Sequence, residues 1–199
     1  MTEHYFSERP GAPHRPGQIR VILPDVYLEL ATDAGVFSPG RLDPGTRLLL
    51  EEAPAPPARG DVLDLGCGYG PVACVLAARS PGAAVWAIDV NERALELTRA
   101  NAAVAEASNV SVCLPGEVPA EVRFDAIYSN PPVRVGKGPL HRLLLEWLPR
   151  LKPGAPAYLV VQRNLGADSL AAWLGEQGFA VTRLKSKKGF RVLEAKAAP

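Results

Sequence analysis

The sequence predicts an α/β fold, a mostly parallel sheet with helices on both faces. From residue 61 onward, short apolar runs of strand length alternate strictly with segments of helix length, which is the order that βαβ units produce. The last two runs, 179–185 and 190–196, are joined by a link too short for a parallel crossover, so one terminal strand must be antiparallel. A chain of 199 residues, 47% hydrophobic and 22% charged, fits one globular domain with a substantial core.

An N-terminal extension, residues 1–57, precedes the alternating body of residues 58–199. Two extended runs around a Pro-Asp turn predict a β-hairpin in the extension. A short helix should follow, with Asp43 as its cap and Pro44 at its first position. The Pro-rich stretch PAPPARG then separates the extension from the body. The elements expected here are strands at 19–23 and 26–31 and a helix at 42–53.

The body begins with a buried strand and ends with the antiparallel pair. One leucine-rich helix stands out because its apolar residues recur at the spacing of a single helical face. Those residues are Leu140, Leu143, Leu144, Trp147, Leu148 and Leu151. The expected strands are 61–65, 85–89, 109–114, 124–129, 155–162, 179–185 and 190–196, and the expected helices are 71–80, 91–106, 139–151 and 168–178.

Composition excludes several classes of protein. No apolar run is long enough to span a membrane, and the first residues lack the pattern of a secretory signal. Three cysteines without zinc-type spacing favour a reduced, cytoplasmic protein that holds no metal. The net charge is only +1, but the run RLKSKKGFR, 183–191, is strongly basic. That run is either a solvated hairpin edge or a patch that contacts phosphates.

A glycine-rich turn follows the first strand of the body. In DLGCGYGPVA, 64–73, glycines at alternate positions allow the backbone to approach a ligand closely. Proline at position 71 breaks the dinucleotide pattern G-x-G-x-x-G. Asp64 stands beside this loop, and Asp89 ends the second strand, at the interval where an acidic residue holds ribose hydroxyls. Together these features predict a nucleoside-type ligand.

The stretch SNPPVRVGK, 129–137, ends the fourth strand of the body. A conjugated exocyclic amine is a poor nucleophile because its lone pair is delocalised. Two acceptors aimed at its hydrogens, the side-chain oxygen of Asn130 and the carbonyl of Pro131, would direct that lone pair toward an electrophile. Pro131 and Pro132 fix the backbone and remove competing N–H donors. A rigid surface turn is the simpler alternative.

These motifs resemble those of class I S-adenosylmethionine-dependent methyltransferases, which share D-x-G-x-G-x-G and an acid at the end of strand two. The resemblance implies a Rossmann-like, seven-stranded sheet with an antiparallel terminal strand and S-adenosyl-L-methionine as cofactor. It implies that the glycine loop faces the methionine part, that Asp89 holds the ribose and that Asp64 helps to orient the loop and, directly or through water, the ligand's ammonium. The predicted cofactor residues are Asp64, Gly66, Cys67, Gly68, Asp89, Val90, Asn130 and Phe37. Phe37 and Ser38 form either a lid over the cofactor or a simple packed loop.

A narrower resemblance is to the small-domain guanine N2-methyltransferases that act on 16S ribosomal RNA, and especially to their short stand-alone members. It is carried by HYFSERP, GVFSPGRLDPGTRLLLE, NPPVRVGK and GFRVLEAK. Larger bacterial enzymes of that group carry an extra N-terminal domain, for which this chain has no room. The family also tends to place an Asp or Asn near the end of the third strand to hold the adenine ring. This chain reads CLPGEV there, so Leu114 can only pack on adenine and Glu117 is the alternative polar partner.

The resemblance also implies how substrate is held. Such enzymes usually carry an aromatic residue after NPP, where this chain has Val133, so Arg134, Phe37 or Phe190 would stack on the base instead. The predicted substrate residues are Val133, Arg134, Lys137 and Phe190.

The leading hypothesis is therefore methylation of guanine N2 in 16S ribosomal RNA, with that RNA or the small ribosomal subunit as partner. Methylation of a protein glutamine is an alternative, although that family prefers tyrosine where Val133 stands. A small-molecule N-methyltransferase and a non-catalytic module that binds RNA or cofactor are further alternatives. No membrane partner is expected.

Overall fold

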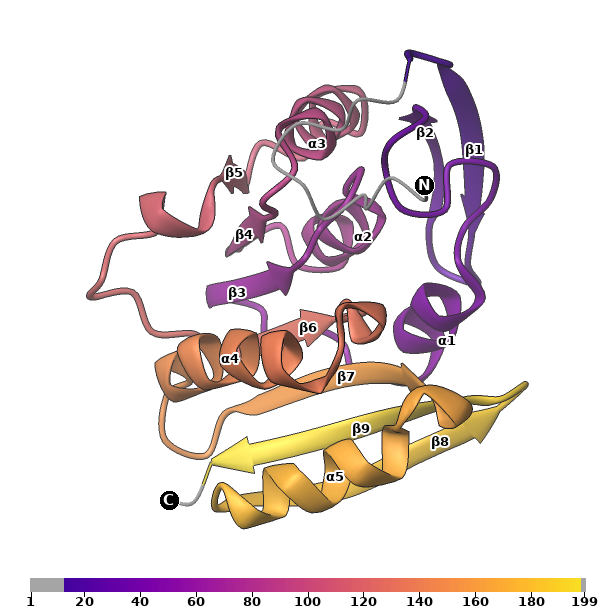
Figure 1. Ribbon diagram of the computed structural model, residues 1–199. Coiled ribbons are helices and arrows are strands. Elements are labelled where there is room, and N and C mark those ends of the chain that lie inside the picture. Colours follow the sequence, from indigo (N-terminus) through magenta and orange to yellow (C-terminus); the bar gives the residue numbers. More distant parts are fainter. Residues whose placement is uncertain (1–12, 198–199) are drawn as a thin grey trace.

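A seven-stranded sheet dominates the computed structural model, which describes residues 13–197 (Figure 1). Its strands lie in the order β5-β4-β3-β6-β7-β9-β8. They are β3 (Gly60–Leu65), β4 (Ala83–Ile88), β5 (Val110–Cys113), β6 (Ala126–Ser129), β7 (Pro156–Gln162), β8 (Phe179–Lys187) and β9 (Phe190–Ala197). The helices are α1 (Pro44–Glu52), α2 (Pro71–Arg79), α3 (Glu92–Val104), α4 (Lys137–Trp147) and α5 (Ala167–Glu176).

Strand directions confirm the predicted fold class. The five strands from β3 to β7 are paired in parallel, and β9 is antiparallel to both of its neighbours, β7 and β8. The stretch HYFSERP and the expected absence of a secretory signal concern residues that lie outside the described part of the chain. No helix within residues 13–197 has the length and apolar character that crossing a membrane requires.

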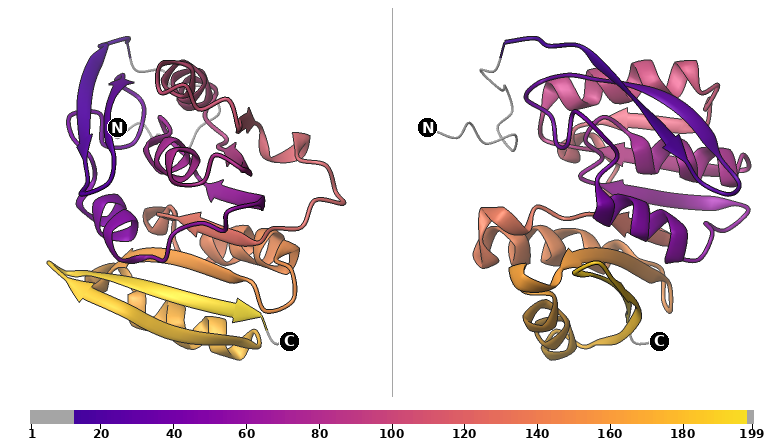
Figure 2. Two further views of the ribbon diagram at one scale, coloured as in Figure 1. Left: turned by 180° about the vertical axis from the view of Figure 1, so that it is seen from behind. Right: turned by 90° about the vertical axis from the view of Figure 1, so that its right-hand side faces the viewer.

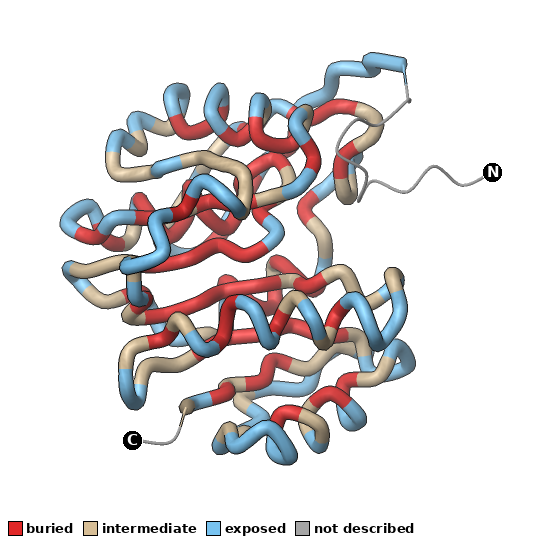
Figure 3. The backbone as a smooth tube through the Cα atoms, turned by 60° about the vertical axis from the view of Figure 1, so that its left-hand side comes forward, coloured by how far each residue is buried: buried red, intermediate tan, exposed pale blue. Residues whose placement is uncertain are grey.

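Helices cover both faces of the sheet, and alternate side chains of a strand enter different cores (Figure 2). In β3, Val62 packs in the core shared with α1, α2 and α3, whereas Leu63 and Leu65 pack with α4 and α5. Buried backbone follows the sheet and the inner sides of the helices (Figure 3). This alternation is the period of two expected of a strand buried on both faces.

The N-terminal extension forms the predicted hairpin and helix. Strands β1 (Gly17–Ile22) and β2 (Tyr27–Thr32) pair antiparallel in a sheet of their own. Asn101 of α3 holds β2, because its amide accepts a hydrogen bond from Ala31 N–H at 2.7 Å and donates one to the Ala31 carbonyl at 2.9 Å. Helix α1 packs against β7 and β9. The division of the chain at residues 57 and 58 stays a prediction.

Several boundaries differ from those predicted by a few residues, and two of the differences have a clear physical cause. The leucine-rich segment is a helix only to Trp147; a 3-10 turn, η3 (Leu148–Arg150), follows because Pro149 has no N–H to continue the helical ladder. The hairpin turn is also shorter than SKKG. Lys188 and Gly189 alone form it, and both have positive φ, +49° and +82°. Such a two-residue turn matches the twist of the paired strands.

Candidate functional site

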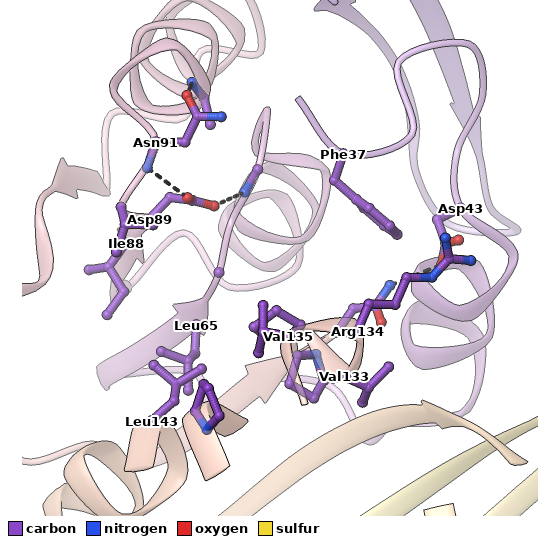
Figure 4. Close-up of a pocket in the computed structure, with 18 of the residues that line it drawn as sticks. Phe37, Asp43, Leu65, Ile88, Asp89, Asn91, Val133, Arg134, Val135 and Leu143 are labelled. Atoms are coloured by element: carbon purple, nitrogen blue, oxygen red, sulfur yellow. Dashed lines mark hydrogen bonds between the residues drawn. The ribbon is translucent and has the colours of Figure 1, made fainter. Parts of the chain in front are cut away.

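A cavity of about 310 Å³ lies at the carboxyl ends of β3, β4 and β6 (Figure 4). Strands β4 and β6 flank β3 on opposite sides, and ligands of open α/β sheets bind at such a switch point. Asp89 lies on one side of the cavity and Asp43 and Arg134 on the other, with the ring of Phe37 between them. Most predicted site residues line it, namely Phe37, Gly66, Gly68, Asp89, Val90, Asn130, Pro131, Pro132, Val133, Arg134 and Phe190.

The glycine loop between β3 and α2 makes a tight turn that is hydrogen-bonded to the end of β4. Gly66, Gly68 and Gly70 all have left-handed backbones, with φ of +79°, +57° and +87°. The N–H groups of Gly66 and Cys67 both donate to the Ile88 carbonyl at 2.9 Å. A Cβ at Gly66 or Gly68 would meet no atom within 4 Å, so the backbone there faces open space where a ligand can approach.

Replacing Gly70 with alanine should destabilise the protein by roughly 3 kcal/mol, because φ is +87° and the added Cβ would lie 2.8 Å from Thr98 Cγ2. Denaturant unfolding monitored by circular dichroism measures the change. Gly175→Ala in α5 is the control: a Cβ there meets nothing within 4 Å, and it should stabilise the helix by about 0.5–1 kcal/mol. Equal effects of the two substitutions would contradict the prediction.

Asp89 links the glycine loop to the start of α3. Its Oδ2 accepts a hydrogen bond from Gly68 N–H at 2.9 Å, and its Oδ1 accepts one from Asn91 N–H at 3.0 Å. Burial raises the pKa of this carboxyl, although the backbone N–H groups bonded to it oppose the rise. A half-buried carboxyl group held in this way, on the wall of a cavity, is suited to accept hydrogen bonds from vicinal hydroxyls.

Asp64, which was predicted to orient the glycine loop and, directly or through water, the ligand's ammonium, does not line the cavity. Its side chain is 1% exposed, and its Oδ2 accepts a hydrogen bond from Ala73 N–H at 2.9 Å, in the first turn of α2. Burial raises the pKa of Asp64 to about 8. The residue therefore positions α2, and through it the glycine loop, from inside the core.

The pKa of Asp64 predicts a pH dependence of stability. Between its ordinary value of 3.8 and about 8, the unfolded carboxyl is ionised while the folded one keeps its proton. The folded state then holds the extra proton, so the free energy of unfolding falls as pH rises, by up to about 1.4 kcal/mol per pH unit. Asp64→Asn, which can keep the bond to Ala73, should flatten this decline in urea unfolding between pH 5 and 8. The exposed Glu96→Gln should leave the decline in place, and an unchanged slope in Asp64→Asn would refute the prediction.

The turn after β6 places Asn130 against the start of α1. Asn130 Nδ2 donates to Asp43 Oδ1 at 2.9 Å and to Thr46 Oγ1 at 3.0 Å. Among residues 13–197, no donor is bonded to Asn130 Oδ1. The Pro131 carbonyl already accepts Val133 N–H at 2.8 Å, which leaves it one lone pair for a ligand. The two predicted acceptors thus lie together at the cavity wall.

The loop that carries Phe37 is tied to α3. Asn91 Nδ2 donates to the Gly35 carbonyl at 2.9 Å, and Arg93 donates to the Ala34 carbonyl at 2.7 Å. These bonds hold the Phe37 ring over the cavity, so the predicted lid is a tethered loop rather than a free one. Phe190 reaches the same cavity from the first position of β9.

Three predicted residues lie elsewhere. Cys67 and Asp64 are buried behind the loop, and burial raises the pKa of the Cys67 thiol, which keeps it neutral. Lys137 lines a smaller adjoining cavity at the start of α4. After β5, Pro115 rather than Leu114 reaches the main cavity. Within residues 13–197, no three His, Cys, Asp or Glu side chains gather as a metal site requires.

Sequence reasoning missed the contacts made by α1. It assigned Asp43 as a helix cap, which the structure confirms, since Asp43 Oδ1 accepts hydrogen bonds from Gly45 and Thr46 N–H at 2.8 and 2.9 Å. The same oxygen also holds Asn130. No local signal in the sequence points to this second role, because the two residues are 87 positions apart.

Comparison with known proteins relates the chain to methyltransferases. The family model of the methyltransferase small domain matches residues 27–194. The uncharacterized protein YbxB of Bacillus subtilis is 35% identical over 199 residues, covering 98% of this chain and 99% of that protein. A ribosomal RNA small subunit methyltransferase C of Chromohalobacter salexigens is 38% identical over 179 residues, covering 84% of this chain and 51% of that protein.

A solved structure, the T. thermophilus 16S rRNA N2 G1207 methyltransferase (RsmC) in complex with AdoMet and guanosine, is similar with a TM-score of 0.77 and 27% identity. The match covers 93% of this chain and 51% of that one. This chain therefore spans about half the length of these two RNA methyltransferases, as the 51% coverage of each records.

Proposed function

Since this chain belongs to the methyltransferase small domain family, we propose that it methylates the exocyclic N2 amine of a guanine in 16S ribosomal RNA, with S-adenosylmethionine as methyl donor. The observation that carries the proposal is the amide of Asn130. Its nitrogen is bonded to the start of α1, while its oxygen accepts no hydrogen bond from any residue of the described range 13–197 and lies on the wall of the cavity that also holds Asp89.

The cavity fits S-adenosylmethionine. Asp89, whose carboxylate oxygens are each bonded to a backbone N–H, accepts the ribose hydroxyls. The open backbone at Gly66 and Gly68 faces the methionine part, and the ring of Phe37 covers the bound molecule. When bound, this cofactor supplies a methyl group on a positively charged sulfur, which makes the methyl electrophilic.

The residues of the NPP turn orient the amine that attacks. Asn130 Oδ1 and the remaining lone pair of the Pro131 carbonyl accept the two hydrogens of the amine, which turns its lone pair toward the methyl group. The amine becomes cationic as it is methylated and only then loses a proton. A strong base is therefore not needed, in keeping with the absence of His or Glu from SNPPVRVGK.

Exposed cations in the lining of the cavity, or within a few residues of it along the chain, support a polyanionic substrate. Arg134 lines the cavity, and Lys137, Arg163 and Lys188 are close to lining residues in the chain. All four are exposed, and none forms an ion pair with another described residue. RNA phosphates would provide the missing partners. In the basic run, by contrast, Lys185 and Lys187 pair with carboxylates of α1.

The proposal is tested by transfer of labelled methyl from S-adenosylmethionine to 30S subunits and to 16S RNA lacking the endogenous modification, followed by nucleoside analysis. The expected product is N2-methylguanosine. Label in a protein fraction instead of RNA would contradict the proposal and favour glutamine methylation. Label in neither fraction would favour a non-catalytic module that binds the cofactor. The substrate also implies a cytoplasmic enzyme.

Salt dependence gives a second test of the RNA partner. Each lost phosphate contact should reduce the slope of log affinity against log salt by about 0.7–0.9. Arg163→Glu and Lys188→Glu should therefore weaken RNA binding and flatten that slope. Arg59→Glu is the matched control. Arg59 is exposed and directly precedes β3, at the end of that strand away from the cavity, so its substitution should change neither the affinity nor the slope.

A further inference from the structure

We infer that Asp43 and Thr46, at the start of α1, are positioning residues that hold the Asn130 amide with its oxygen toward the target amine. The inference rests on the proposed role of Asn130 as an acceptor for that amine. It goes beyond that role, because it makes the N-terminal extension part of the catalytic apparatus. The pair is called the α1 clamp below.

The hydrogen bonds determine which way the amide points. Asn130 Nδ2 donates to Asp43 Oδ1 at 2.9 Å and to Thr46 Oγ1 at 3.0 Å, so both of its hydrogens are used. A carboxylate can only accept, and therefore the nitrogen must face Asp43. If the amide turned by 180°, its oxygen would lie against the carboxylate, where two acceptors repel each other.

The clamp itself is rigid. Asp43 Oδ1 also accepts the N–H groups of Gly45 and Thr46, so three donors converge on one oxygen and fix its place at the helix terminus. Thr46 is only 4% exposed, which limits the access of water to its hydroxyl. Behind it, Leu49 is fully buried in the core between α1 and the sheet. The amide is thus held by a packed helix rather than by a surface loop.

Loss of the clamp should impair turnover more than cofactor binding. The NPP turn would remain, but its amide would rotate and present nitrogen instead of oxygen to the amine for part of the time. Asp89, the proposed ribose ligand, is bonded to the glycine loop and to the start of α3, and it forms no hydrogen bond with Asp43 or Thr46. Binding of S-adenosylmethionine should therefore persist.

Two substitutions at position 43 separate the clamp from the helix cap. Asp43→Ser keeps a good N-cap but shortens the side chain so that it no longer reaches Asn130. We expect kcat for methyl transfer to fall about 10- to 100-fold, as misplaced catalytic groups do, with the Kd for S-adenosylmethionine within about 2-fold of wild type. Asp43→Asn can place an amide oxygen where Oδ1 lies and should restore most of the kcat lost in Asp43→Ser.

A second pair of closely matched substitutions tests Thr46. Thr46→Val has nearly the same shape but no acceptor, so one Nδ2 hydrogen is left without a partner, and kcat should fall about 3- to 10-fold. Thr46→Ser returns the hydroxyl and should recover kcat relative to Thr46→Val. A helix that merely lost packing would not follow this pattern, because serine fills less space than valine.

The hydrogen-exchange rate of the Asn130 side-chain NH2 reports whether the α1 clamp holds that group, and it can be measured without any substrate. NMR of protein labelled with ¹⁵N-asparagine gives this rate. Slow exchange in wild type and fast exchange in Asp43→Ser, together with the kcat losses above, would support the inference. Unchanged exchange, or full turnover in Asp43→Ser, would overturn it. If the wild type has a protected amide yet methylates no RNA, the proposed function fails, while the exchange data still decide the clamp.

Discussion

Replacing Asn130 with alanine should lower kcat for methyl transfer about 100- to 1000-fold, the range found when one preorganised polar group of an active site is removed. The alanine variant keeps the prolines of the turn but loses the oxygen that accepts one amine hydrogen. The amine then keeps its lone pair in conjugation and is poorly aimed at the methyl group. Single-turnover transfer to 16S RNA measures the loss.

Binding provides the internal check on this prediction. Asn130 is bonded to α1 and not to the proposed ribose site, so Asn130→Ala should bind S-adenosylmethionine with nearly unchanged affinity in calorimetry. Asn164→Ala is the matched control, because Asn164 is exposed in the 3-10 turn η4 (Arg163–Leu165). Its activity should equal that of wild type. Retention of activity in Asn130→Ala would exclude the amide as an acceptor for the amine.

Replacing Asp89 with alanine should weaken binding of S-adenosylmethionine about 100-fold or more. A hydrogen bond to a charged group contributes about 1.5–3 kcal/mol, and two ribose hydroxyls would lose their acceptor. The substitution also leaves the N–H groups of Gly68 and Asn91 without a partner, which loosens the glycine loop. The Kd from titration calorimetry reports the combined effect.

A control has to separate the loss of a negative charge from the loss of the contacts that Asp89 makes. Glu96→Ala removes the same charge from the exposed side of α3 and should leave the Kd unchanged. Thermal unfolding of the ligand-free Asp89→Ala protein shows how much of the effect is loss of the fold. Wild-type affinity in Asp89→Ala would place the ribose elsewhere in the cavity.

Local patterns predicted most of the sheet and half of the residues that line the cavity. The alternation of strand and helix is readable because burial imposes a period of two on strands and 3.6 on helices. Glycine spacing predicted a tight loop at Gly66, Gly68 and Gly70, and the structure gives all three a left-handed backbone, a local conformation that glycine allows. The turn at Asn130 was likewise recognised from adjacent residues, because proline restricts the backbone wherever it stands.

Contacts between distant segments were not readable in the same way. The glycine pattern alone did not show that Asp64 acts on the loop from inside the core, where its side chain is bonded to Ala73 N–H because strand alternation puts it on the α2 face of β3. The hairpin turn was predicted two residues too long, as SKKG instead of Lys188 and Gly189, because two neighbouring lysines carry no signal of which one adopts positive φ.

The sequence by itself determined the α/β class, the antiparallel terminal strand, the glycine loop and the presence of Asn130 beside two prolines. Only the tertiary structure decided what faces Asn130 and how Phe37 is held. Packing of α1 on β7 and β9 brings Asp43 to Asn130, and bonds to α3 tether the loop of Phe37. The physical reason is that these contacts depend on how helices dock on the sheet, a balance of burial over the whole core that no short stretch of sequence records.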